Sequence, residues 1–156
     1  MGRTEDVIAM AADVAGTAHA GQLDKVGANY IEHTARVAEH VRLLFPEAPD
    51  SAVAVAWLHD VIEDTEVSFR DLILWGFSME IIAGVDAMTK RNSEPVEDYF
   101  SRVRANPIAR MVKAADLKDN TDPVRVAKLD PATADRLRAK YAKATELLAL
   151  DELATN

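Results

Sequence analysis

The segment His59-Asp60-Val61-Ile62-Glu63-Asp64 places one imidazole and three carboxylates at the end of an apolar stretch. Glu63 lies four residues after His59, so these two side chains share a helical face. Asp64 stands in the same relation to Asp60. Carboxylates placed this close together repel one another unless a cation or water offsets their charge. The segment is therefore a candidate for metal binding and for general acid–base chemistry.

Two further residues put polar groups where a packed helix should carry apolar ones. His33 lies on the apolar stripe of its predicted helix, and Asp116 ends the largely apolar run 109–115. Taken alone, each is most simply a hydrogen-bonded polar group in the core. Together with His59 and Asp60 they would form a mixed nitrogen and oxygen site, which suits Mn²⁺, Fe²⁺ or another divalent first-row ion.

The elements that must position these side chains are all predicted to be helices. Apolar spacing and capping residues predict helices over about 4–20, 30–45, 52–62, 69–75, 79–88, 107–118 and 131–150, with another through Tyr99 and Val103. No alternating strand pattern, glycine-rich phosphate loop, internal repeat or linker is found. The chain is therefore predicted to be all-α, with residues 1–156 forming one domain of packed helices.

Composition narrows the class of protein. The 156 residues are 49% hydrophobic, which is enough to bury a core and excludes a disordered chain. The absence of cysteine excludes a disulfide framework, a thiolate zinc site and a cysteine nucleophile. The first residues do not resemble a signal peptide, and no apolar stretch is long enough to span a bilayer. These features predict a cytoplasmic protein.

The charge is unevenly distributed along the chain. The net charge of −8 argues against binding of a nucleic-acid polymer or an anionic membrane. Residues 47–86 carry 1 basic and 9 acidic residues, whereas residues 89–128 carry 9 basic and 6 acidic ones. A divalent cation would offset part of the acidic excess. The basic segment suits a phosphate group placed between the two, so a single nucleotide remains a compatible ligand.

These motifs resemble those of the HD superfamily of metal-dependent phosphohydrolases, specifically the hydrolase domain of RelA/SpoT-type alarmone enzymes and their small stand-alone relatives. Residues 56–65, Ala-Trp-Leu-His-Asp-Val-Ile-Glu-Asp-Thr, are similar to the HDxxED motif of that family. Residues 18–33 are similar to its first motif, and Lys113-Ala114-Ala115-Asp116 followed by Asn120 is similar to its last. The resemblance covers about residues 18–120, and the predicted C-terminal helix at about 131–150 lies beyond it.

The resemblance implies a compact helical bundle of the HD-domain type and assigns roles to the site residues. One metal ion, usually Mn²⁺ in this branch, would be held by His33, His59, Asp60 and Asp116. Glu63 and Asp64 would position or activate the attacking water. Lys25, in the basic loop of the family, would hold phosphate or base, and Asn120 would contact the nucleotide. Further candidate phosphate partners, each also readable as an ordinary surface cation, are Lys90, Arg91, Lys113 and Lys118.

The sequence departs from that of the alarmone hydrolases at positions that bear on the choice of substrate. Asp24 and Val26 stand where that family usually has Arg and Ser, and Asp122-Pro123 replaces a basic residue and Thr. The missing Arg removes a cationic stacking surface, and Asp24 would repel a polyphosphate if it faced the pocket. The sequence therefore predicts a metal-dependent phosphohydrolase that acts on a nucleotide. Guanosine 3′,5′-bis(diphosphate) 3′-pyrophosphohydrolase is one specific activity within that prediction.

Two alternatives stay open from the sequence. One is an HD hydrolase of a different nucleoside phosphate, and the other is a non-catalytic regulatory module that binds metal or nucleotide. The intact Glu63-Asp64 pair favours catalysis, because a purely structural metal site would not need it. His19 is predicted to be a structural hydrogen-bonding residue. A homo-oligomer, formed through the apolar face of the last helix, also stays open.

Overall fold

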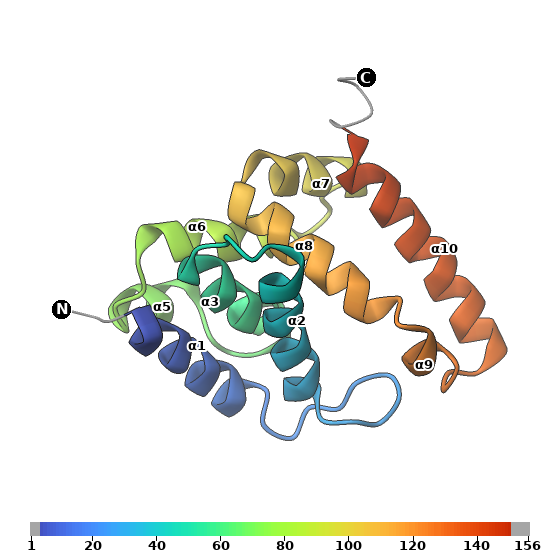
Figure 1. Cartoon of the computed structure of the whole chain (residues 1–156), viewed down its shortest axis with the longest axis horizontal. Coiled ribbons are helices and arrows are strands. Elements are labelled where there is room, and N and C mark those ends of the chain that lie inside the picture. Colours follow the sequence, from blue (N-terminus) through green and yellow to red (C-terminus); the bar gives the residue numbers. More distant parts are fainter. Residues whose placement is uncertain (1–3, 151–156) are drawn as a thin grey trace.

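The computed structural model describes residues 4–150, which form helices joined by short loops (Figure 1). Within these residues the only extended pairing is an isolated bridge between Leu23 and Asn29. The predicted all-α class is confirmed. The helices are α1 (Thr4–Ala18), α2 (Tyr30–Leu44), α3 (Asp50–Leu58), α4 (Val61–Asp64), α5 (Phe69–Leu74), α6 (Met79–Met88), α7 (Val96–Ala105), α8 (Pro107–Asn120), α9 (Pro123–Val126) and α10 (Pro131–Leu148).

Side-chain caps explain where several helices begin. Ser68 and Asp71 form a reciprocal capping box at α5, as their spacing predicts. The hydroxyl of Ser78 accepts a hydrogen bond from a backbone N–H at the start of α6. Asn106 and Asp130 cap α8 and α10 in the same way, each followed by a proline at the first helical position. These starts are predictable because a cap acts within one turn of its helix.

The apolar stretch predicted as one helix over about 52–62 is interrupted. Helix α3 begins at Asp50 and ends at Leu58, and α4 begins at Val61. Asp60, between them, has φ −110° and ψ 1°, outside the helical range. On a continuous helix the side chains of His59 and Asp60 would diverge by about 100°. The break instead brings His59 Nε2 and Asp60 Oδ2 to 2.9 Å.

A second difference is the short helix α9, which the sequence reading did not predict. The Asp122 carboxylate accepts a hydrogen bond from the backbone N–H of Val124, and Pro123 occupies the first helical position. Asp122 and Pro123, two of the residues that depart from the alarmone-hydrolase pattern, therefore begin a turn of helix.

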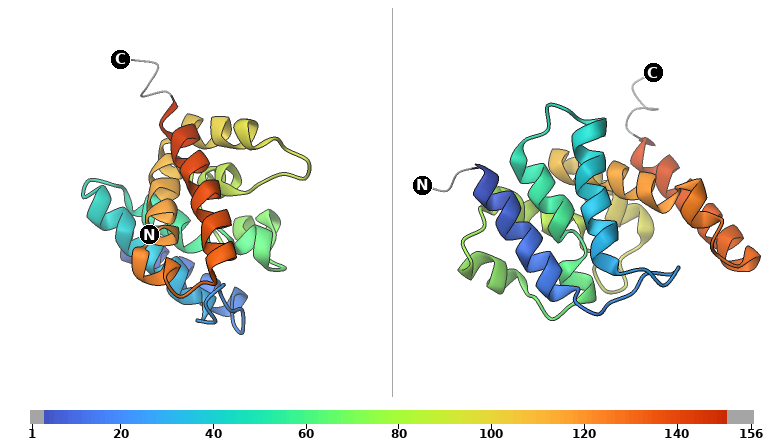
Figure 2. Two further views of the ribbon diagram at one scale, coloured as in Figure 1. Left: turned by 90° about the vertical axis from the view of Figure 1, so that its right-hand side faces the viewer. Right: turned by 60° about the horizontal axis from the view of Figure 1, so that its bottom comes forward.

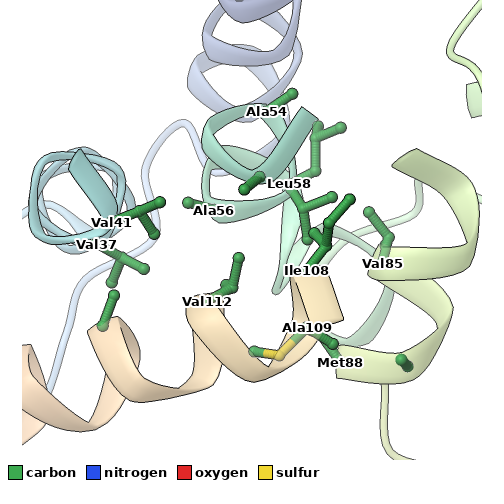
Figure 3. Packing of buried hydrophobic residues seen from close by; sticks show 14 of the residues in the cluster. Val37, Val41, Ala54, Ala56, Leu58, Val85, Met88, Ile108, Ala109 and Val112 are labelled. Atoms are coloured by element: carbon green, nitrogen blue, oxygen red, sulfur yellow. The ribbon is translucent and has the colours of Figure 1, made fainter. Parts of the chain in front are cut away.

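Helix α3 lies at the centre of the core, in contact with α1, α2, α6 and α8. Figure 3 shows Val41 of α2, Ala56 of α3 and Val112 of α8 directed toward one another, and all three are fully buried. The alanines of α3 let its neighbours approach closely. A Cβ atom built on Gly84 of α6 would lie 2.8 Å from Val55 Cγ2. The helices that carry the candidate site residues are thus held by tight packing.

Helix α10 packs on α7 and α8 at one side of the molecule (Figures 1 and 2). Arg104 of α7 fixes one end of it by donating a hydrogen bond to the carbonyl oxygen of Leu147 at 2.7 Å. Helix α10 thus lies beside α8, and the loop 21–29 lies near the same side of the molecule (Figure 1).

Among the described residues, no helix is both long and apolar enough to cross a membrane.

Candidate functional site

Helix packing brings the four predicted metal ligands together. One possible metal-ligand atom from each of His33 on α2 and His59 and Asp60 at the α3–α4 break, a ring nitrogen or a carboxylate oxygen, lies within 4.8 Å of the other two. Asp116 of α8 joins them, with its Oδ1 atom 3.1 Å from His33 Nε2 and 3.5 Å from His59 Nε2. The two histidines and Asp116 are buried. These four residues, called the His/Asp cluster below, come from three separate stretches of the chain.

Both imidazoles are oriented by their Nδ1 atoms. His59 Nδ1 donates to the carbonyl oxygen of Ala56 at 2.6 Å, and His33 Nδ1 donates to Asp119 Oδ2 at 2.6 Å. The Nε2 atoms therefore carry the lone pairs when the rings are neutral. His59 Nε2 is buried and makes no hydrogen bond, although Asp60 Oδ2 lies 2.9 Å away. Lone pairs facing carboxylates repel unless a cation or proton lies between them, so the cluster fits a divalent metal ion.

The electrostatics of the cluster favour positive charge within it. Burial alone lowers the pKa of His59, but Asp60 and Asp116 outweigh burial and raise that pKa well above its usual value. Burial raises the pKa of Asp116, whereas Lys113 and the two imidazoles lower it more, to well below its usual value. Lys113 Nζ lies 3.2 Å from Asp116 Oδ2. The site thus holds its carboxylates ionised and attracts a proton or a metal ion.

Glu63 and Asp64 lie on α4, at the edge of the cluster. Glu63 Oε1 accepts a hydrogen bond from the backbone N–H of Lys90, and Asp64 Oδ2 accepts one from Gln22 Nε2 at 3.3 Å. Burial, together with the charge of Asp60, raises the pKa of each carboxyl above its ordinary value. A carboxylate with a raised pKa is a better proton acceptor. Raised pKa values at the edge of the cluster are compatible with the general-base role predicted for this pair.

Two residues of the site were missed by sequence reasoning, Tyr30 and Asp119. The Tyr30 hydroxyl donates to Asp60 Oδ2, and its ring contacts both His19 and His33. Asp119 is 1% exposed and accepts the hydrogen bond of His33 Nδ1. Its position three residues after Asp116 places both on one face of α8, which is a signal that could have found it. His19 donates to Gln22 Oε1 at 2.8 Å, which agrees with its predicted structural role.

The cluster opens into a pocket of about 720 Å³. Its walls come from the loop 21–29, the loop 89–95, α7, α8, α9 and α10. Five lysines contribute to the lining: Lys25, Lys90, Lys113, Lys140 and Lys143. Burial lowers the pKa of Lys25 and of Lys140, and neighbouring cations lower both further. Positive side chains gathered in this way suit an anionic ligand.

The predicted substrate residues meet the pocket in different ways. Lys25, Lys113 and Asn120 all line it. Asn120 Nδ2 donates to Asp116 Oδ1 at 3.1 Å, and Lys113 Nζ lies over the ring of Tyr99 at 5.4 Å. Two other candidate phosphate partners, Arg91 and Lys118, do not contribute to the lining.

Asp24 does not act as an isolated negative charge in the pocket. Its Oδ1 atom accepts the backbone N–H groups of Val26 and Ala28, both at 2.9 Å. Its Oδ2 atom lies 3.2 Å from Arg125 Nη2, and its side chain is 4% exposed. The repulsion of a polyphosphate that was expected if Asp24 faced the pocket is therefore offset by Arg125.

Comparison with known proteins agrees with the fold. No family model matches this chain. A solved structure described as a metazoan orthologue of SpoT that hydrolyses ppGpp and plays a role in starvation responses matches with a TM-score of 0.75. The match has 22% sequence identity and covers 91% of this chain and 85% of that chain. The all-helical bundle that the sequence predicts is confirmed by this shared fold.

Proposed function

We propose that this protein is a metal-dependent phosphohydrolase that acts on a nucleotide. One observation carries the proposal: a buried cluster of two histidines and two aspartates adjoins two carboxyls of raised pKa in a single pocket with basic walls. A metal that only stabilised the fold would not need the adjoining carboxyls. A pocket that only bound an anion would not need the His/Asp cluster.

The His/Asp cluster would hold the ion, and its donor set suits Mn²⁺ or Fe²⁺. When bound, such an ion lowers the pKa of water and polarises a phosphoryl oxygen. Glu63 or Asp64 accepts the proton of the attacking water or holds that water in line. The hydrogen bond from the Lys90 N–H fixes the Glu63 carboxylate in place for this role. Water attacks phosphorus, and the sugar oxygen leaves.

Guanosine 3′,5′-bis(diphosphate) is the specific substrate we propose. The described activity of the structural relative, ppGpp hydrolysis, and the lysine-lined pocket support this choice. Lys25 and Lys113 would contact phosphate groups, and Asn120 would contact the nucleotide. Attack at the 3′ phosphorus would release pyrophosphate.

The test combines metal analysis with a release assay. Purified protein is loaded with Mn²⁺ and incubated with ppGpp and a panel of nucleoside mono-, di- and triphosphates, while phosphate and pyrophosphate are quantified. Pyrophosphate release from ppGpp is expected, and its loss in His59→Ala is expected together with loss of bound metal. Asp86→Asn serves as the matched control, because that carboxylate is 49% exposed and lies outside the cluster. Bound metal without turnover of any nucleotide would contradict the proposal and favour a regulatory binding module.

A further inference from the structure

A chain of buried ion pairs connects a candidate metal ligand to the pocket loop. Asp119 Oδ2 accepts from His33 Nδ1 at 2.6 Å and lies 2.7 Å from Arg125 Nη1. The other arm of the same guanidinium, Nη2, lies 3.2 Å from Asp24 Oδ2 in the loop 21–29. The side chains of Asp119, Arg125 and Asp24 are 1%, 19% and 4% exposed, so solvent screens these charges weakly.

Among the described residues, Arg125 is the one whose side chain contacts both the Asp24 and the Asp119 carboxylates. Its Nη1 atom also donates to the backbone oxygen of Asp119 at 3.2 Å, which fixes the guanidinium against the end of α8. Asp119 is held from a second direction by Arg36, whose Nε atom donates to Oδ1 at 2.7 Å. Loss of Arg125 therefore loosens the Asp119 carboxylate without leaving it unpaired.

Asp24 uses its two oxygens for separate tasks. Oδ1 accepts the N–H groups of Val26 and Ala28 and so shapes the loop, whereas Oδ2 faces Arg125. An asparagine can keep the Oδ1 contacts while presenting an amide instead of a charge to Arg125. The shape of the loop and its connection to Arg125 can therefore be separated by one substitution.

We propose that Arg125 is a positioning residue that couples the loop 21–29 to the metal site, through Asp24 on one side and Asp119 and His33 on the other. The inference rests on the proposed function and deepens it, because this loop also carries Lys25. A ligand that holds the loop in place orients His33 for the ion, and the ion in turn favours the loop position that fits the ligand. Such coupling is reciprocal by thermodynamic necessity.

The first experiment measures Mn²⁺ affinity by titration calorimetry on metal-free protein without nucleotide. We expect Asp24→Asn and Arg125→Gln each to weaken Mn²⁺ binding about five- to tenfold, at the low end of typical couplings between sites. Their double variant should be no weaker than Arg125→Gln alone, because both break one connection. Asp119→Asn should lose about 10- to 100-fold, as residues that orient a metal ligand do. Arg138→Gln, which breaks an exposed pair with Asp135, is the control and should change nothing.

A second readout separates positioning from general damage to the fold. Turnover of Asp24→Asn should return to the wild-type value at saturating Mn²⁺, and its far-ultraviolet circular dichroism spectrum without metal should match wild type. Asp24→Asn that binds Mn²⁺ as tightly as wild type would overturn the coupling, even if Arg125→Gln did not fold. Additive losses in the double variant would also overturn it. A wild-type chain that binds no ion would instead refute the proposed function, so the two failures are distinguishable.

Discussion

Replacing Asp116 by Asn removes one negative charge from the His/Asp cluster and keeps the size of the side chain. The Oδ1 atom of Asp116 lies 3.1 Å from His33 Nε2 and 3.5 Å from His59 Nε2, where the two imidazole lone pairs converge. An asparagine in that place still offers an oxygen to the amide of Asn120, so α8 keeps its packing. We expect Asp116→Asn to fold and to lose its affinity for Mn²⁺.

The size of the effect follows from the burial of the site. Two unit charges about 4 Å apart at an effective dielectric constant of about 20 interact by roughly 4 kcal/mol. At about 1.4 kcal/mol per tenfold, losing the carboxylate weakens Mn²⁺ binding by about three orders of magnitude. With free Mn²⁺ at about 100 times the wild-type Kd, the wild type gains about 2.7 kcal/mol of stability. That gain raises Tm by roughly 5–10 °C for a chain of this size, whereas the variant gains less than about 0.1 kcal/mol.

The assay is thermal denaturation of metal-free protein with and without added Mn²⁺, followed by far-ultraviolet circular dichroism. Each variant is compared with its own metal-free baseline, because Lys113 Nζ, 3.2 Å from Asp116 Oδ2, loses its partner in the variant. Asp86→Asn removes an equal charge from an exposed position and should keep the full rise in Tm. A rise in Asp116→Asn equal to that of the wild type would refute the assignment of this carboxylate to the metal site.

Three further predictions address catalysis, pH and packing. Glu63→Gln should keep its Mn²⁺ Kd but lose about 100- to 10,000-fold in pyrophosphate release, and unchanged turnover would reassign the general base. Burial raises the pKa of Asp119, but His33 and the neighbouring arginines outweigh burial and lower that pKa to about 2. The ionised Asp119 carboxylate therefore stabilises the fold above about pH 4, and this stabilisation is lost as the pH falls toward 2. Urea denaturation of metal-free protein between about pH 5 and pH 2 should therefore show about 1–2 kcal/mol more loss in wild type than in Asp119→Asn, after allowance for solvent screening. Equal slopes would contradict the pairing. Gly84→Ala should destabilise the protein by about 1–3 kcal/mol through the clash with Val55, whereas Gly16→Ala, which meets nothing within 4 Å, should not, and urea denaturation distinguishes them.

The helices themselves could be predicted because their signals are local. Ser68, Ser78, Asn106 and Asp130 each cap a helix through a backbone N–H group three residues away. Apolar spacing then identifies the buried face of each helix. The residue types of the candidate site were equally visible, because carboxylates and histidines are conspicuous at positions that should be apolar.

The break between α3 and α4 could not be predicted from the sequence. The alanines at 52, 54 and 56 favour an uninterrupted helix, and no Gly or Pro marks a stop. One contact at the break comes from a residue remote in sequence, since the Tyr30 hydroxyl donates a hydrogen bond to Asp60. A second contact is local, since His59 Nδ1 donates to the Ala56 carbonyl oxygen. Local propensity is worth a fraction of a kcal/mol per residue, so a few buried contacts outweigh it.

By itself, the sequence determined the all-α class, most helix starts and the set of residues able to bind a metal, because periodicity, capping and side-chain chemistry act within a turn of chain. Only the tertiary structure decided that Asp116 meets His33 and His59, that Asp119 orients His33, and that Asp24 faces Arg125 instead of an incoming phosphate. Those pairings join residues that lie 57 to 101 positions apart in the sequence. Their geometry is set by how α2, α3 and α8 pack, since the close-packed core fixes the distance between side chains that the chain itself leaves unrelated.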